Sequence, residues 1–213
     1  MLALIIAILI GLAVTLACDY MGRKKLINDE LSRKLPHITV ALLYGALPFV
    51  VDIKFVTIGA ALQLIGAPIA LKLKLFHHAR KIDRKSWGEF TFPAGVLLAS
   101  LITDDKWVFA AAMLNLGIAD ALAAFVGRKY GRKNGYKILT QTKSVAGSLA
   151  FYICSLFITV LALQKLGMDG QMFWQTLLWL PITLTAAENA GVYGLDNLTI
   201  PVLAAAILNP LVV

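Results

Sequence analysis

The chain has 213 residues, of which 59% are hydrophobic, and it carries 20 Lys and Arg against 12 Asp and Glu, for a net charge of +8. Soluble domains have about 45 to 50% apolar residues, so this composition excludes an ordinary water-soluble enzyme and indicates an integral membrane protein. Cys18 and Cys154 fall at or inside apolar runs, where we expect them to serve as apolar side chains.

Eight apolar runs are candidates for membrane-spanning helices. A helix needs about 17 to 25 apolar residues to cross a bilayer, although tilt tolerates somewhat shorter ones. The second and fourth runs are short, so seven spans are the alternative. We expect an all-α polytopic membrane protein with one domain over residues 1–213, whose first run is retained because it lacks the basic start and cleavage site of a signal peptide. The candidate spans are residues 2–18, 37–51, 55–71, 87–102, 107–126, 144–163, 172–187 and 198–213.

Basic residues are distributed unevenly along the chain. All but three of the 20 Lys and Arg lie in segments that follow the first, third and fifth spans. Because such loops remain on the cytoplasmic side, we expect these segments in the cytoplasm and both termini outside. The loop ENAGVYGLDN, after the seventh span, lies on that side and carries two acids, Glu188 and Asp196, with no base. An ordinary polar turn is the alternative interpretation of this loop.

The segment LKLKLFHHARKIDRKSW, residues 71–87, has apolar residues at helical spacing and bases on the other face. This pattern predicts a helix that lies on the membrane surface. His77 and His78 would point about 100° apart on such a helix, so they cannot jointly hold one metal ion.

Asp120 lies inside the fifth apolar run, in the stretch GIADALAAFVGRKYG. An ionised carboxylate at this depth costs several kcal/mol unless it is paired. We therefore expect a partner, which is either a basic side chain in a structural ion pair or a bound cation at a functional site. Gly127 lies on the same helical face, where its missing side chain would leave room for a ligand.

The stretch TKSVAGS, residues 142–148, begins the sixth span. Ser144 can cap this helix, Lys143 adds a charge, and Gly147 and Ser148 keep the first turn small and polar. Unpaired amides and the helix dipole at such a start favour phosphate. Ordinary capping is the alternative.

A basic group, ELSRKLPHI at residues 30–38, precedes the second span. Arg33, Lys34 and His37 would share a broad face if they lie on one helix, and a break at Pro36 is the alternative. Arg and Lys at this position can bind phosphate, or they can simply set the membrane topology.

These elements all fall at one predicted membrane face. Acids that can hold a divalent ion, beside bases and amides that can hold phosphates, are the parts of a nucleotide-dependent phosphoryl transfer site. The sequence therefore favours an enzyme over a scaffold.

The motifs resemble a known family when taken in order. They are ELSRKLPH, RKSWGEFTFPAG, ADALAAFVGRKYG, TKSVAGS and GLDNLTIP, which run from about residue 30 to residue 202. They resemble the membrane CTP-dependent lipid kinases, namely phytol kinase, dolichol kinase and the CTP-using diacylglycerol kinase, a group that is similar to phosphatidate cytidylyltransferase. The resemblance implies a catalytic membrane domain that opens to the cytoplasm, with CTP as phosphoryl donor, magnesium as cofactor and a lipid alcohol, most simply an isoprenoid, as acceptor.

The resemblance also implies roles for the matched residues. We expect Asp120 and Asp196 to hold magnesium and Asp120 and Lys143 to be catalytic. Glu188, which the resemblance does not match, is our candidate catalytic base for the alcohol. The family usually has Gly where this chain has Ala119, and ENAG lacks a Ser that often precedes GLDN. The residues expected to bind the nucleotide and its phosphates are Arg33, Lys34, His37, Gly127, Ser144, Gly147, Ser148 and Asn197.

Two other functions are compatible with the sequence. A cytidylyltransferase would join CTP to a lipid phosphate and release pyrophosphate. A lipid or ion transporter would use Asp120 as its coupling acid, although no inverted repeat is visible in the chain.

Overall fold

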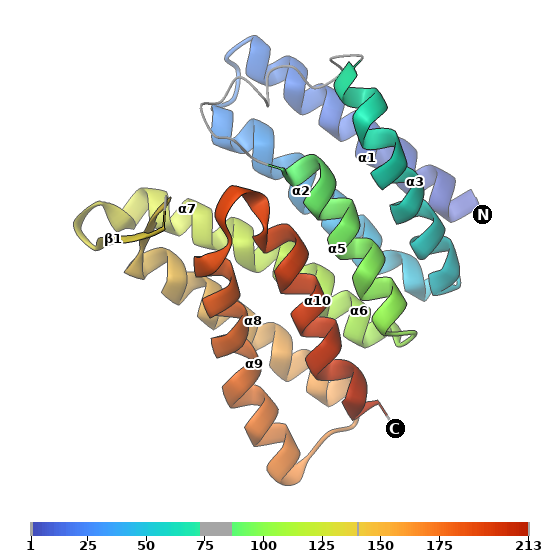
Figure 1. Ribbon diagram of the computed structural model, residues 1–213, viewed down its shortest axis with the longest axis vertical. Helices are drawn as coiled ribbons and strands as arrows, with labels where there is room; N and C mark the ends of the chain where they lie inside the picture. The colour runs from blue at the N-terminus through green and yellow to red at the C-terminus, as the bar shows by residue number, and fades with distance from the viewer. Residues whose placement is uncertain (1, 73–86, 140, 213) are drawn as a thin grey trace.

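The computed structural model describes residues 2–72, 87–139 and 141–212. Within these ranges the fold is a bundle of helices that run back and forth (Figure 1). The helices are α1 (Leu2–Arg23), α2 (Asp29–Ala46), α3 (Ile53–Lys72), α5 (Gly88–Ile102), α6 (Lys106–Leu114), α7 (Asp120–Tyr130), α8 (Val145–Lys165), α9 (Gly170–Ala190) and α10 (Asp196–Leu208). Short 3-10 turns are η1 (Leu47–Phe49), η3 (Gly131–Lys133), η4 (Val192–Gly194) and η5 (Asn209–Leu211), and η2 (Asn115–Ala119) is a π-helical turn that joins α6 to α7.

The outer surfaces and the lengths of the helices support the prediction of a polytopic membrane protein. Many large apolar side chains face outward, such as Leu9 and Leu16 of α1, which are 58% and 45% exposed. Lipid rather than water is the solvent that such a surface requires. Four helical stretches in the described part of the chain are long and apolar enough to cross a membrane, namely Leu2–Arg23, Ile53–Lys72, Lys106–Lys133 and Val145–Lys165. The expected number of eight spans stays a prediction.

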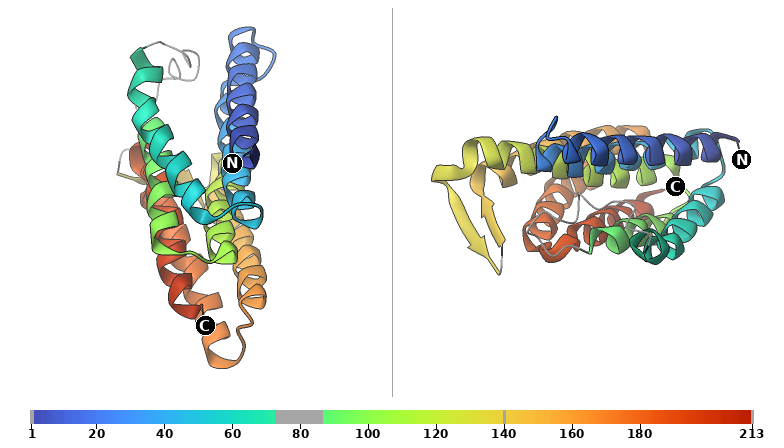
Figure 2. Two further views of the ribbon diagram at one scale, coloured as in Figure 1. Left: turned by 90° about the vertical axis from the view of Figure 1, so that its right-hand side faces the viewer. Right: turned by 90° about the horizontal axis from the view of Figure 1, so that it is seen from above.

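The polar connections gather at one end of the bundle. The β-hairpin and the turn between α9 and α10 lie at this end, and both chain termini lie away from it (Figures 1 and 2). The expected surface helix at residues 71–87, with His77 and His78, falls almost entirely outside the described residues. Trp87 is described, and its backbone N–H donates a hydrogen bond to the Tyr193 backbone carbonyl at 2.8 Å.

Helix α2 begins earlier than the apolar run that marks it. It starts at Asp29 because the Asn28 side chain accepts a hydrogen bond from the Leu31 N–H at 2.8 Å, a standard cap. Pro36 lies within this helix, so of the two alternatives the structure has the unbroken helix. The basic motif is therefore helical, and Lys34 is buried within the bundle.

A short β-hairpin, which the sequence did not predict, precedes α8. Strands β1 (Gly135–Ile138) and β2 (Gln141–Ser144) are antiparallel, with Tyr136 opposite Lys143. The hairpin ends at Ser144, the residue that caps α8. It therefore fixes Lys143 at the start of that helix.

Glycines set the closest helix contacts around the polar end. A Cβ on Gly117, in the π-helical turn, would lie 2.7 Å from the Ala41 Cβ of α2. A Cβ on Gly95 of α5 would lie 2.2 Å from the Asn197 carbonyl oxygen of α10. Because real atoms cannot approach so closely, α2 and α10 hold their positions only while these residues are glycine.

We therefore expect Gly95→Ala to lower the thermal melting midpoint of the detergent-solubilised protein. Overpacking of this kind costs about 1 to 3 kcal/mol. The matched control is Gly66→Ala in α3, where an added Cβ meets nothing within 4 Å and the loss of a helical glycine stabilises by up to about 1 kcal/mol. Equal melting midpoints for the two variants would contradict the contact between α5 and α10.

Candidate functional site

A cavity of about 440 Å³ opens at the polar end of the bundle. Its walls come from α2, α7, the β-hairpin, the start of α8 and the turn between α9 and α10. Segments far apart in the sequence thus meet here. The expected site residues that line it are Arg33, Lys34, Asp120, Gly127, Lys143, Ser144, Gly147, Ser148, Glu188, Asp196 and Asn197.

Asp120 is paired with Lys34. The Lys34 ammonium donates to Asp120 Oδ2, and both residues are only 4% exposed. The sequence left open whether a base or a cation would be the partner of this acid, and the structure supplies a base. The acid is nevertheless not sealed in the protein interior, because it lines the cavity, whose rim includes the 61% exposed side chain of Arg128.

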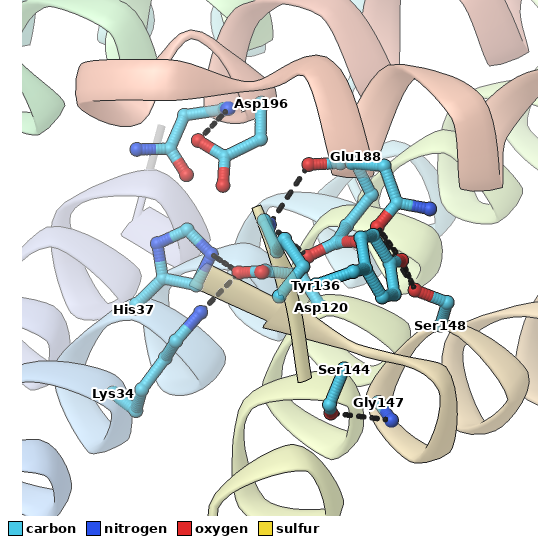
Figure 3. A network of polar contacts seen from close by, with 12 residues as sticks. Lys34, His37, Asp120, Tyr136, Ser144, Gly147, Ser148, Glu188 and Asp196 are labelled. Carbon is cyan, nitrogen blue, oxygen red and sulfur yellow. Dashed lines mark hydrogen bonds and ion pairs between the residues drawn. The ribbon is translucent and has the colours of Figure 1, made fainter. Parts of the chain in front are cut away.

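His37 lies one turn deeper on α2 than Lys34 and is not among the residues that line the cavity. Its Nε2 is 3.0 Å from the Leu116 carbonyl oxygen and 3.4 Å from Asp120 Oδ2 (Figure 3). The structure thus places His37 behind Asp120 and not in the cavity wall, and contact of His37 with the nucleotide stays a prediction. With its proton on Nε2, the ring donates to the π-helical turn and supports the segment that carries Asp120.

The π-helical turn itself was not foreseen. The Asp120 N–H donates to the Asn115 carbonyl, five residues back, instead of four as in an α-helix. This single wider turn changes which face of α7 points to the cavity. Such turns are frequent at functional sites.

The start of α8 is capped as expected. Ser144 Oγ accepts a hydrogen bond from the Gly147 N–H at 3.1 Å. A Cβ on Gly127 would lie 3.0 Å from Ser144 Oγ, and one on Gly147 would lie 2.9 Å from the Ala123 carbonyl oxygen. The two glycines thus let α7 and α8 touch, so the missing Gly127 side chain serves helix packing as well as the cavity wall. Binding of an anion at this helix start stays a prediction.

Lys143 and Glu188 form a second ion pair. The Lys143 ammonium donates to Glu188 Oε1 and, at 2.9 Å, to the Glu188 backbone carbonyl. The Lys143 side chain is 16% exposed and that of Glu188 is 6% exposed. The two expected catalytic residues are therefore in direct contact.

Three polar side chains beside this pair form a hydrogen-bond triangle. The Tyr136 hydroxyl donates to Asn189 Oδ1 at 2.8 Å, Ser148 Oγ donates to the same oxygen at 2.9 Å, and the two hydroxyls are 2.5 Å apart. The triangle ties the hairpin to α8 and α9 (Figure 3). Sequence reasoning missed Tyr136 and Asn189, because no pattern in the chain signals that the hairpin meets α9.

Asp196 lines the same cavity as Lys34, and the two side chains come from separate helices, α10 and α2 (Figure 3). It precedes the expected span 198–213, and burial, followed by the nearby Asp120 carboxylate, raises the pKa of its side chain to about 6. Among the described residues no group of three His, Cys, Asp or Glu is placed to hold a metal ion. Magnesium is usually held by only one or two carboxylates together with substrate phosphates and water. Asp120 and Asp196, which both line the cavity, supply that number of carboxylates, and magnesium binding stays a prediction.

Comparison with known proteins gives two relatives. The chain is 28% identical to phytol kinase of Synechocystis sp. over 205 residues, which cover 89% of this chain and 82% of the relative. It is 27% identical to dolichol kinase EVAN of Arabidopsis thaliana over 85% of this chain, and it spans only 35% of that longer protein. No family model matches the chain. No solved structure matches it significantly.

The two matches each cover most of this chain. Four of the five ordered motifs contribute residues to the wall of a single cavity. The chain is accordingly similar, over most of its length, to two proteins that are named as kinases of lipid alcohols, a phytol kinase and a dolichol kinase.

Proposed function

We propose that the protein is a CTP-dependent kinase that transfers the γ-phosphoryl group of CTP to the hydroxyl of a membrane lipid alcohol. The observation that carries this proposal is the meeting of buried bases and acids from distant motifs around one cavity. The relatives are named for kinases of phytol and dolichol, which are both isoprenoid alcohols. We extend that substrate class to this chain, with phytol, geranylgeraniol or a polyprenol as acceptor.

The bases of the cavity would bind the nucleotide phosphates. Lys34, Lys143 and Arg33 line the wall. The Val145 and Gly147 N–H groups in the first turn of α8 already donate, to the Asn134 carbonyl at 3.0 Å and to Ser144 Oγ at 3.1 Å, so the side-chain bases carry this part of the proposal. Transfer of a phosphoryl group passes through a loose transition state in which negative charge is spread over the phosphate oxygens. Fixed positive groups in a water-poor site stabilise this charge, so positioning and electrostatics suffice without a covalent intermediate.

Asp120 and Asp196 would hold the magnesium ion, which when bound would neutralise charge on the nucleotide phosphates. In this proposal Lys34 has two tasks. It fixes the Asp120 carboxylate against α2, and its ammonium contributes positive charge at the same wall of the cavity.

Glu188 would accept the proton of the lipid hydroxyl as the hydroxyl oxygen bonds to the γ-phosphorus and CDP leaves. The Glu188 carboxylate lines the cavity and is held in place by Lys143. The apolar tail would remain among the helices, while its hydroxyl reaches the polar end of the bundle. We place that end, with the whole cavity, on the cytoplasmic side and both termini outside, because basic residues follow α1, α3 and α7.

Position-specific labelling of CTP tests the reaction. Membranes that contain the protein, incubated with a panel of lipid alcohols and γ-labelled CTP, should yield a labelled lipid phosphate. α-Labelled CTP should leave the lipid unlabelled. A cytidylyltransferase would give the reverse result with a lipid phosphate as acceptor, and a transporter would label no lipid at all.

The buried pair Lys34 and Asp120 provides a second test, which separates stability from catalysis. Asp120→Asn or Lys34→Met alone should lower the melting midpoint, because an unpaired buried charge costs about 3 to 5 kcal/mol. The double variant should recover much of that stability. Kinase activity should nevertheless stay at least about a hundredfold down in Asp120→Asn and in the double variant, as for other lost electrostatic groups.

The matched control is Asp19→Asn in α1. It removes another buried carboxylate, which pairs with Arg23 and does not line the cavity, and it should leave kcat nearly unchanged. Near-normal kinase activity in the Lys34→Met and Asp120→Asn double variant would show that this ion pair is structural and has no role in catalysis.

A further inference from the structure

A buried carboxylate joins two arginines at the rim of the cavity. Glu30 Oε1 accepts from Arg33 Nη2 at 2.8 Å, and Glu30 Oε2 accepts from Arg128 Nη2 at 2.5 Å. The Glu30 side chain is 6% exposed, whereas those of Arg33 and Arg128 are 37% and 61% exposed. One acid of α2 thus holds a guanidinium from its own helix and another from the end of α7.

The position of this group separates it from an ordinary surface ion pair. Glu30, Arg33 and Arg128 all line the cavity that contains Asp120 and Lys143. Exposed ion pairs contribute little to stability, but a carboxylate buried between two guanidiniums offsets their mutual repulsion and holds both in place. By contrast, the pair Arg23 and Asp19 lies within α1 and outside the cavity wall.

The hydrogen-bonding capacity of the arginines points to a ligand. A guanidinium has five N–H donors, and each of these two directs one terminal nitrogen to Glu30. Donors therefore remain on both groups, and the exposure of the side chains leaves them accessible from solvent. A single guanidinium can bind a phosphate group with two parallel hydrogen bonds, which a lysine ammonium cannot reproduce.

We infer that Glu30 is a positioning residue and that Arg33 and Arg128 form an arginine pair that binds the outer phosphates of the nucleoside triphosphate. This inference rests on the proposed kinase function and adds Arg128 and Glu30 to its site. Glu30 does not touch the substrate. It acts by holding the two guanidiniums side by side across the gap between α2 and α7.

Steady-state kinetics distinguishes this role from a structural one. Arg128→Ala should raise the KM for CTP by about tenfold to a hundredfold, because hydrogen bonds between charged groups are strong. The KM for the lipid alcohol should not change. Arg128→Lys should raise the KM for CTP less than Arg128→Ala does, since lysine keeps the positive charge but lacks the two parallel N–H donors of the guanidinium. Glu30→Gln should also raise the KM for CTP. Glu30→Asp, which keeps the carboxylate, should raise this KM less.

A binding experiment tests the inference without catalysis. Inorganic tripolyphosphate, which has the phosphates without the nucleoside, should raise the melting midpoint of the wild-type protein in detergent. The shift should shrink in Arg128→Ala and Glu30→Gln and persist in the control Asp19→Asn. If Arg128→Ala keeps the full shift while the wild type is an active kinase, the inference is overturned. If tripolyphosphate binding depends on Arg128 but γ-labelled CTP phosphorylates no alcohol, the arginine pair stands and the proposed reaction fails.

Discussion

A carboxylate and an ammonium, those of Asp120 and Lys34, lie buried against each other between α7 and α2. In apolar surroundings neither charge is tolerable without the other, so the two helices must pack in the one register that joins them. Gly117 permits this register, because any side chain there would meet Ala41 of α2. The pair therefore fixes where the rest of the polar end can assemble.

The other walls of the cavity depend on similarly close contacts. Gly127 and Gly147 allow α7 and α8 to touch, which brings the capped start of α8 next to the Asp120 helix. Gly95 allows α5 to contact the start of α10, where Asp196 and Asn197 lie. Small residues at helix contacts are the usual means of close packing in membranes. Here they also determine how near the charged groups come to one another.

Charge compensation is the common feature of the cavity. Asp120 pairs with Lys34, Glu188 with Lys143, and Glu30 with two arginines. Each base is thereby held in a fixed position beside an acid. A site of this kind suits a ligand that carries both positive and negative charge, such as a nucleoside triphosphate with its divalent cation. Fixed dipoles and charges need little reorganisation when such a ligand binds. This is the physical basis on which we favour phosphoryl transfer.

The sequence by itself determined the helical membrane architecture, the Ser144 cap and the motifs that line the cavity, because hydropathy and capping act over a few residues. It did not reveal the hairpin, the π-helical turn before Asp120 or the deeper position of His37. Nor did it identify the ion pairs, whose partners are 86 residues apart for Lys34 and Asp120, 45 for Lys143 and Glu188, and 98 for Glu30 and Arg128. Such pairings depend on how packed helices are rotated and spaced, and only the tertiary structure decides this.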